Sequence, residues 1–369
     1  MTTTPPPWVI IADYPRWPSP YFAHLERHAA GLPLAFRPRL GDLDPAWPPG
    51  VVNLHRLKRL YRDPGTGTMA AAESFLARLA ALKEEGWRVA WTVHGLLPVD
   101  GPPPGPADHA AAAGVLGLAD AVLCHTRADA RTLEGRTKAR TWVVGWSCLD
   151  PPAAPAPETT ALAARMRRWP LAFLLLGNLT AYKDAPAVAA MFLRRTRRAC
   201  LAVAGHCPDP RAARALERTA AASGGRLLLH PRRVDPGQAG HLYAAAHAAV
   251  CPYRTDGRYA FLADVFYPGS IGTAAGFAVP VIAPALAAVE EITAGQLRWL
   301  ARPGTPAALG DAMTAAENGL LDLAVVGDPR NDRPAGISTD RGRQAAATYH
   351  QAARWLACQP GGTAPARRG

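Results

Sequence analysis

Residues 267–284 read YPGSIGTAAGFAVPVIAP, and this stretch is the most informative part of the chain. A turn at Pro268 and Gly269 leads into a run of small residues that we expect to be a short helix, and an apolar strand follows at 279–283. A helix that begins at such a turn presents unpaired backbone N–H groups together with the positive end of its dipole. The stretch therefore predicts an anion site at the start of the helix.

A second segment of this kind lies upstream, at residues 174–184 (LLLGNLTAYKD). A buried strand ends at Gly177 and Asn178, and Lys183 follows six residues after the glycine. An ammonium group and backbone amides are good ligands for phosphate oxygens. The two segments suggest one diphosphate held from two sides, by Lys183 on one side and on the other by Gly269, Ser270, Ile271, Gly272 and Thr273.

Outward from these segments, strands alternate with helical stretches along most of the chain, which is typical of parallel βαβ units. We expect strands at 8–12, 51–55, 88–93, 119–124, 140–144, 171–176, 199–204, 226–229, 248–251 and 279–283. The Pro-rich residues 150–157 read as a linker that divides the chain into two α/β halves with a ligand cleft between them.

The pattern predicts a domain order of four parts. An N-terminal Rossmann-like domain covers residues 1–150 and a C-terminal one covers 151–335. A last helix at 336–358 is expected to return to the N-terminal domain, and residues 359–369 are expected to be a disordered tail.

Composition narrows the class of protein. The chain has 369 residues, of which 49% are hydrophobic, so two folded cores are expected. The net charge of +12 favours an anionic partner, although a solvated basic surface is the alternative. No nucleic-acid-binding motif is visible, so nucleic acid is not an expected partner.

Other features point to a cytoplasmic protein. The N-terminus has no signal-peptide pattern, and no apolar run of about 18 residues is present. The cysteines form no CxxC pair and no metal-binding spacing, so we expect reduced, mostly buried thiols at Cys124, Cys148, Cys200, Cys207, Cys251 and Cys358. The basic residues in 56–62 (RLKRLYR) leave open either a contact with the anionic inner face of a membrane or an ordinary helix surface.

Several well-known motifs are missing from the sequence. It contains no GxGxxG after a strand, no GxxxxGK[ST], no HExxH and no GxSxG. An Asp-x-Asp pair occurs at Asp42 and Asp44, but it lies in a Pro-rich loop away from the expected phosphate segments. We therefore predict no metal site and no cofactor.

The order of the motifs resembles family-4-type retaining glycosyltransferases, which have the GT-B fold. Residues 177–184 look like their G-R-L-x-x-x-K-G segment, residues 276–282 resemble their A-x-G-x-P-V-I strand, and residues 92–96 resemble their T-x-H-x-x segment. Residues 226–253 resemble the stretch that holds the nucleotide base. The likeness covers roughly residues 8–320.

The resemblance implies a fold, an activity and roles for residues. The C-terminal half would bind a UDP- or GDP-type sugar, and the N-terminal half would bind the acceptor, a small molecule or a lipid-linked glycan. His94 would face the donor sugar, while Arg232, Arg233 and Val234 would flank the nucleotide. A transfer with retention of configuration and without metal is implied in the same way.

The sequence departs from the family pattern at two places. Asn178 stands where the family has Arg, so Lys183 is the remaining cation of that motif. The family's E-x7-E pair falls on Val265 and Thr273, with Asp264 one residue out of register. The chain therefore looks like a divergent branch. An inactive nucleotide- or partner-binding module and a sugar-nucleotide epimerase are the alternatives.

Each candidate residue also has a plain structural interpretation. Lys183 could be a solvated lysine at a helix start, Ser270 a simple N-cap, and His94 a capping or core histidine. Arg232 and Arg233 could be a solvated pair. In the first β–α loop an acceptor-binding role competes with ordinary packing for Asp13, Tyr14, Arg16 and Trp17.

Overall fold

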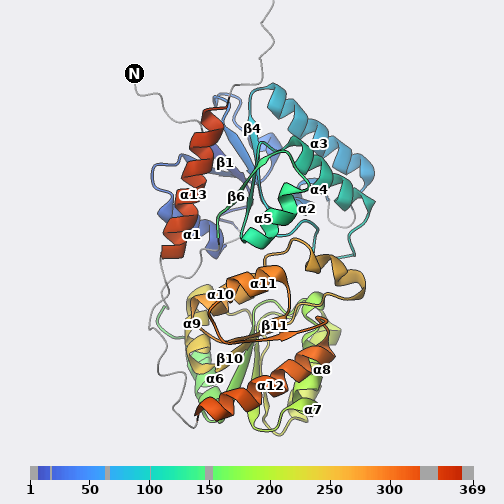
Figure 1. Cartoon of the computed structure of the whole chain (residues 1–369), viewed down its shortest axis with the longest axis vertical. Coiled ribbons are helices and arrows are strands. Elements are labelled where there is room, and N and C mark those ends of the chain that lie inside the picture. The colour runs from blue at the N-terminus through green and yellow to red at the C-terminus, as the bar shows by residue number, and fades with distance from the viewer. Residues whose placement is uncertain are drawn as a thin grey trace, which may run out of the picture. The chain divides into compact units, whose positions relative to one another are not determined.

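The computed structural model describes residues 7–16, 19–62, 67–99, 101–145, 153–324 and 340–359. The chain divides into two compact units, and each is built on its own six-stranded parallel sheet (Figure 1). Unit 1 comprises Met1–Cys148, Asp264–Tyr267 and Thr339–Gly369, and unit 2 comprises Leu149–Ala263 and Pro268–Ser338. Trp17, Cys148, residues 150–152 of the expected linker and residues 360–369 lie outside the described residues.

The sheet of unit 1 has the strand order β2-β1-β3-β4-β5-β6. Its strands are β1 (Trp8–Ile11), β2 (Leu34–Arg37), β3 (Val51–Leu54), β4 (Arg88–Thr92), β5 (Ala121–Cys124) and β6 (Arg140–Val143). Its helices are α1 (Pro20–His28), α2 (Lys58–Tyr61), α3 (Met69–Glu84), α4 (Pro106–Leu118), α5 (Arg127–Glu134) and α13 (Asp340–Ala357), with a short 3-10 turn η1 (Leu40–Asp42).

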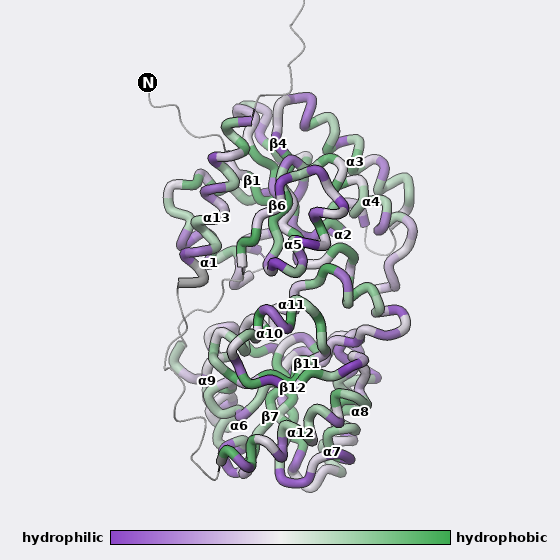
Figure 2. Tube along the Cα trace, viewed as in Figure 1, coloured by the Kyte–Doolittle hydropathy of each residue, from purple (hydrophilic) through white to green (hydrophobic). Residues whose placement is uncertain are grey.

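The inner strands of this sheet are apolar throughout because helices cover both of its faces. One face packs Trp91 and Val89 against Leu79 of α3 and Val115 of α4. The other face packs Trp8 against Tyr349 of α13, with ring centroids 5.6 Å apart. In Figure 2 the strands inside each unit are mostly hydrophobic.

The last helix, α13, belongs to unit 1, which confirms the expected return of the chain to the N-terminal half. A buried row of hydroxyls fixes it there. The Tyr349 hydroxyl lies 2.8 Å from the Tyr21 hydroxyl of α1 and 2.9 Å from Thr92 Oγ1. Thr92 Oγ1 in turn donates to Asn53 Oδ1 at 3.1 Å.

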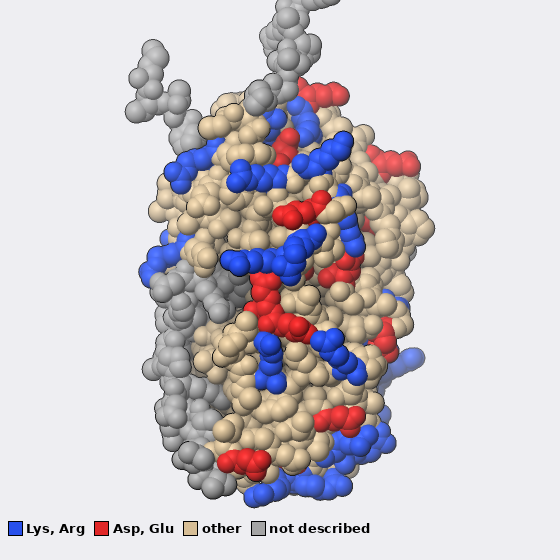
Figure 3. Space-filling view, in the orientation of Figure 1, with Lys and Arg blue, Asp and Glu red and all other residues tan. Residues whose placement is uncertain are grey.

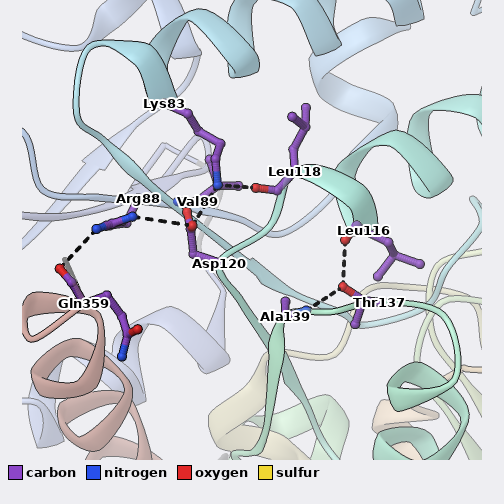
Figure 4. Close-up of polar contacts among 9 residues, drawn as sticks. All are labelled: Lys83, Arg88, Val89, Leu116, Leu118, Asp120, Thr137, Ala139 and Gln359. Atoms are coloured by element: carbon purple, nitrogen blue, oxygen red, sulfur yellow. Dashed lines mark hydrogen bonds and ion pairs between the residues drawn. The ribbon is translucent and has the colours of Figure 1, made fainter. Parts of the chain in front are cut away.

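The amino-terminal edge of the same sheet is closed by Asp120, the residue before β5 (Figure 4). Its carboxylate accepts from Lys83 Nζ at 2.7 Å and from the Val89 amide at 2.8 Å, and the Arg88 guanidinium lies 3.8 Å away. Arg88 also donates to the carbonyl of Gln359. These contacts tie α3, β4 and Gln359, which lies just after α13, together at the edge opposite to the carboxyl ends of the strands.

The sheet of unit 2 has the strand order β12-β11-β10-β7-β8-β9. Its strands are β7 (Leu171–Leu176), β8 (Ala199–Ala204), β9 (Leu227–His230), β10 (Ala248–Val250), β11 (Val281–Pro284) and β12 (Arg298–Ala301). Its helices are α6 (Pro157–Arg167), α7 (Ala185–Arg195), α8 (Pro210–Ala221), α9 (Pro236–Ala245), α10 (Gly269–Gly276), α11 (Ala287–Ile292) and α12 (Pro306–Ala324), with 3-10 turns η2 (Ala181–Lys183) and η3 (Gly257–Ala263).

A buried carboxylate also closes the amino-terminal edge of unit 2. Glu317 of α12 accepts hydrogen bonds from the three successive amides of residues 197–199, at the start of β8.

The parallel sheets confirm the predicted fold class. The two strands that the sequence did not predict are β2 and β12. Each lies at an edge of its sheet, where half-buried strands carry a weaker apolar signal.

On one face of the molecule the positive charge is not concentrated in a patch. On the face drawn in Figure 3, Lys and Arg side chains are interspersed with Asp and Glu. Within the described part of the chain no helix has the length and apolarity that crossing a bilayer requires.

Candidate functional site

In the sheet of unit 2, β7 and β10 are neighbours in space but not in sequence, because the chain runs outward from β7 through β8 to β9 and then returns to the other side. Ligands of such sheets bind just beyond the carboxyl ends of the strands at this switch point. Gly177 and Lys183 follow β7 here, while Cys251 and Tyr253 follow β10.

Lys183 lies in the 3-10 turn η2 and is only 4% exposed. Its ammonium lies 5.8 Å from the centroid of the Tyr253 ring. No carboxylate and no hydrogen-bond acceptor among the described residues pairs with it. Burial lowers the pKa of Lys183 to about 8, although the nearby Cys251 sulfur opposes part of this effect. Burial also raises the pKa of the Cys251 thiol to about 11, so at neutral pH it supplies no counter-charge.

Two glycines make room for this lysine. Gly177 has a φ of +110°, and a Cβ atom on it would lie 3.4 Å from Lys183 Nζ. Gly205, at the end of β8, has a φ of +145°, and a Cβ atom there would lie 1.9 Å from the Gly177 carbonyl oxygen. The backbone thus packs closely beside the ammonium, as glycine alone allows.

The structure brings the other predicted segment, residues 267–284, to the same place. Helix α10 begins at Gly269, and the hydroxyl of Ser270 lies 2.5 Å from the Tyr253 hydroxyl. Tyr253 therefore contacts Lys183 through its ring and Ser270 through its oxygen. Pro268 is the N-cap residue, so the interpretation of Ser270 as an N-cap is wrong.

The predicted set of phosphate-binding amides is smaller than expected. The amides of Ile271 and Gly272 both donate to the Pro268 carbonyl, at 2.9 and 3.3 Å, because the N-cap carbonyl accepts the first bonds of the helix. Ile271 is buried in the core, and Thr273 Oγ1 donates to the Gly269 carbonyl at 2.9 Å. This leaves Gly269 and Ser270 at the tip of α10.

The remaining predicted donor residues lie at the same edge of the sheet but further along it. Asn178 is exposed directly after β7. Arg232 and Arg233 are exposed and Val234 is half-buried, in the loop after β9, which is separated from β7 by β8. Their roles stay predictions.

The residues at the position of the family's acidic pair have other partners. The Asp264 carboxylate accepts two bonds from the Arg136 guanidinium, at 2.6 and 2.9 Å, and both residues belong to unit 1. Val265 packs in the core of unit 1. Neither residue replaces the missing glutamate.

In the first β–α loop the structure favours packing for the tyrosine. The Tyr14 ring lies 4.6 Å from that of Phe36, and its hydroxyl donates to Glu26 at 3.1 Å. Arg16 is exposed and Asp13 is half-buried. Trp17 lies outside the described residues, so acceptor binding by this loop stays a prediction.

Three histidines form a row along the carboxyl edge of the sheet of unit 1. His55 follows β3, His94 follows β4 by one intervening residue, and His125 follows β5. His55 Nδ1 lies 2.9 Å from His94 Nε2, and His94 Nδ1 lies 2.9 Å from His125 Nε2. His125 Nδ1 lies 2.6 Å from the carbonyl oxygen of Gly145, after β6. Each of the three strands leads directly to a histidine in the sequence, and this was the signal that could have revealed the row.

All three histidines are neutral at physiological pH. Burial lowers the pKa of His55 and of His94 well below 6.5, and neighbouring His125 and Arg56 lower both further. Burial also lowers the pKa of His125 to about 4, against the opposing effect of its bond to Gly145. In this structure both nitrogens of the His94 ring are engaged by His55 and His125. The expected contact of His94 with the donor sugar stays a prediction.

Other predicted features have local roles. Asp42 accepts from the Arg39 amide and Asp44 from the Ala46 amide, so both carboxylates close turns. Among the described residues no group of three or more His, Cys, Asp or Glu side chains is arranged so that it could hold a metal ion. In segment 56–62, Leu57 and Tyr61 are buried, and Arg62 pairs with Asp108. This segment therefore presents fewer side chains to a membrane than its sequence suggested.

Two six-stranded parallel sheets with flanking helices, carried by one chain, define the GT-B fold of glycosyltransferases. Among solved structures the chain is similar to HepE of Anabaena in complex with UDP and glucose (TM-score 0.58, 12% identity, 96% of this chain and 92% of that one). It is also similar to the UDP-forming alpha,alpha-trehalose-phosphate synthase of Burkholderia vietnamiensis (TM-score 0.50, 13% identity, 91% of this chain and 78% of that one). No protein-family model and no curated protein matches the chain. At these identities the likeness is one of fold.

Proposed function

We propose that this protein is a glycosyltransferase that moves a sugar from a nucleoside diphosphate sugar, of UDP or GDP type, to a hydroxyl of a small-molecule or glycan acceptor. The observation that carries the proposal is the buried, unpaired ammonium of Lys183 at the switch point of the sheet of unit 2. The GT-B fold supports it, as do the UDP and glucose named for HepE.

A buried charge without a partner destabilises a protein, so its presence needs a reason. The diphosphate of a bound donor would supply the missing negative charge. When the sugar–phosphate bond breaks, negative charge grows on the leaving phosphate, and Lys183 would stabilise that charge without transferring a proton. The tip of α10 at Gly269 and Ser270 would add the positive end of a helix dipole.

The reaction would proceed with retention and without metal, by attack of the acceptor hydroxyl on the face that the diphosphate leaves. The leaving oxygen would take up the hydroxyl proton. Arg232, Arg233 and Val234 would flank the base, and Gly177 and Asn178 would border the phosphates. Unit 1 would bind the acceptor, and Asp13 and Arg16 of its first β–α loop would contact it.

A thermal-shift panel of UDP, GDP, ADP and TDP tests the donor site, because a ligand that binds only the native state raises the melting temperature. We expect UDP or GDP to raise it in the wild-type protein and to raise it less in Lys183→Ala. If no nucleotide raises it, the proposal fails. If one does, a donor screen separates transfer or hydrolysis from the alternatives: an epimerised donor would indicate an epimerase, and an unchanged donor would indicate an inactive binding module.

A further inference from the structure

The row of His55, His94 and His125 has a fixed direction. A backbone carbonyl can only accept a hydrogen bond, so His125 Nδ1 must carry the proton that points at Gly145. In a neutral ring the other nitrogen then accepts, so His94 donates through Nδ1 to His125 Nε2. By the same rule His55 donates through Nδ1 to His94 Nε2. One carbonyl therefore sets the tautomer of all three rings.

The open end of the row is His55 Nε2. This atom is a hydrogen-bond acceptor, it is buried, and it has no partner among the described residues. A buried polar atom without a partner destabilises a folded protein, so it calls for a donor that binds there. The rest of the row is satisfied, which singles out this one nitrogen.

The fold places that nitrogen at a second switch point. In the sheet of unit 1 the chain runs outward from β1 to β2 and then returns to β3 on the other side of β1. The row follows the strand order β6, β5, β4, β3, and its centroid spacings of 4.9 and 5.2 Å match the distance between neighbouring strands. Its open end therefore reaches the junction of β3 and β1, where parallel sheets bind ligands.

Aromatic packing holds the rings in place. Tyr21 of α1 lies edge-on to all three imidazoles, with centroid distances of 5.8, 5.2 and 5.7 Å to His55, His94 and His125. Phe22 lies edge-on to His55 at 4.9 Å. These rings offer carbon atoms rather than donors, so they fix the direction of His55 without satisfying its free nitrogen.

We propose that His55 Nε2 binds a hydroxyl group of the sugar acceptor, and that His94, His125 and the Gly145 carbonyl are positioning groups that keep this nitrogen unprotonated. This hydroxyl donates its hydrogen to Nε2 and so anchors the acceptor, while a different hydroxyl of the acceptor attacks and passes its proton to the leaving oxygen. Because these imidazoles are weak bases, His55 holds the proton without removing it. This inference rests on the proposed transferase function.

Nitrogen NMR of the full-length protein with 15N-labelled histidine tests the direction of the row. We expect His55, His94 and His125 to carry their proton on Nδ1, the less common tautomer in water. His247 is an internal reference for the opposite tautomer, since its Nδ1 accepts from the Ala172 amide at 3.0 Å. A proton on His55 Nε2 would overturn the proposal.

Two variants of His125 test the positioning role. In His125→Gln the side-chain oxygen can still accept from His94, so the tautomers of His94 and His55 should be retained. In His125→Phe this acceptor is lost, and His55 should populate the Nε2–H tautomer. If the two variants give the same tautomer at His55, then His125 does not position it. If His125→Phe does not fold, the test still stands on His125→Gln, in which the His55 signal should show the wild-type tautomer.

Binding is tested with D-glucose, D-galactose and D-mannose as probes. At least one should move the His55 Nε2 resonance and leave that of His247 unchanged. His55→Asn retains a donor toward His94 but has no acceptor at the position of Nε2, so it should lose this sugar binding, with an unchanged UDP-induced thermal shift. If no sugar moves the His55 signal, the inference is wrong. The UDP shift reports separately on unit 2, so failure of the donor proposal is distinguishable.

Discussion

At the scale of single residues, Lys183 and the histidine row share a design in which a polar group is buried and left one partner short. For Lys183 the missing partner is an anion, and for His55 it is a hydrogen-bond donor. In both cases the missing partner lowers the free energy of unfolding of the protein without its ligand. Binding of the ligand would remove this cost, which couples stability to occupancy of the site.

The first prediction concerns Lys183→Met, which replaces the ammonium by an apolar group of similar length. Lowering the pKa from 10.5 to about 8 corresponds to roughly 3 kcal/mol of destabilisation by the charged form. Below pH 8 the full cost is present. Between pH 8 and 10.5 the unfolded chain binds more protons than the native protein, so wild-type stability rises toward that of the variant.

Urea unfolding at pH 7 and near pH 10 measures this difference. We expect the free energy of unfolding of Lys183→Met to exceed that of the wild type at pH 7 and to approach it near pH 10. The exposed Lys138 provides the control, because Lys138→Met should change little at either pH. A Lys183→Met variant that is less stable at pH 7 would argue that this lysine has a hidden counter-charge.

At the scale of elements, the tip of α10 can be tested through two neighbouring positions. Gly269→Val places a branched side chain where the proposed phosphate approaches, so it should abolish nucleotide binding by the folded protein. Ser270→Ala removes the bond to the Tyr253 hydroxyl but leaves the backbone in place, so its effect on affinity should be below about tenfold. Calorimetry of both variants, with melting temperatures as the folding control, makes the comparison. A larger loss in Ser270→Ala would make the hydroxyl the ligand.

Elements also show where sequence reasoning succeeds. The strand β7 (LAFLLL) and its neighbours are continuous apolar runs because both faces of the sheet are covered, and such runs are legible in a sequence. The edge strand β12 (RWLA) is half-buried and carries an arginine, so its pattern is ambiguous. The motif order predicted that Lys183 and Ser270 would lie at one site. It did not predict that Tyr253 contacts both, because the position of Tyr253 depends on β7 and β10 being neighbours.

At the scale of the whole molecule, the return of α13 makes the last helix part of the first unit. Tyr349→Phe tests how firmly it is held. The change leaves the buried hydroxyls of Tyr21 and Thr92 short of a partner, and we expect a loss of about 1–3 kcal/mol in unfolding free energy. Tyr14→Phe is the control, because its bond to Glu26 is exposed and should contribute little. Equal losses in the two variants would mean that the buried row adds no special stability.

The histidine row belongs to this scale as well. His55, His94 and His125 are each visible in the sequence at the end of a strand, but only the strand order makes them neighbours. The sequence alone does not connect His94 with the other two histidines. That its two nitrogens bond to His55 and His125 could not be predicted, because this depends on the strand order. Residue type and local position were predictable, whereas the contacts between parallel strands were not.

Under the proposed function the buried ammonium of Lys183 holds the diphosphate of the donor. Calorimetric titration of UDP and of uridine into the wild-type protein and Lys183→Met tests it most directly. We predict that the variant binds UDP about 10- to 100-fold more weakly, as expected for the loss of one charge-assisted contact, and binds uridine as the wild type does. Equal UDP affinity in the two proteins, or an equal loss for uridine, would contradict the account.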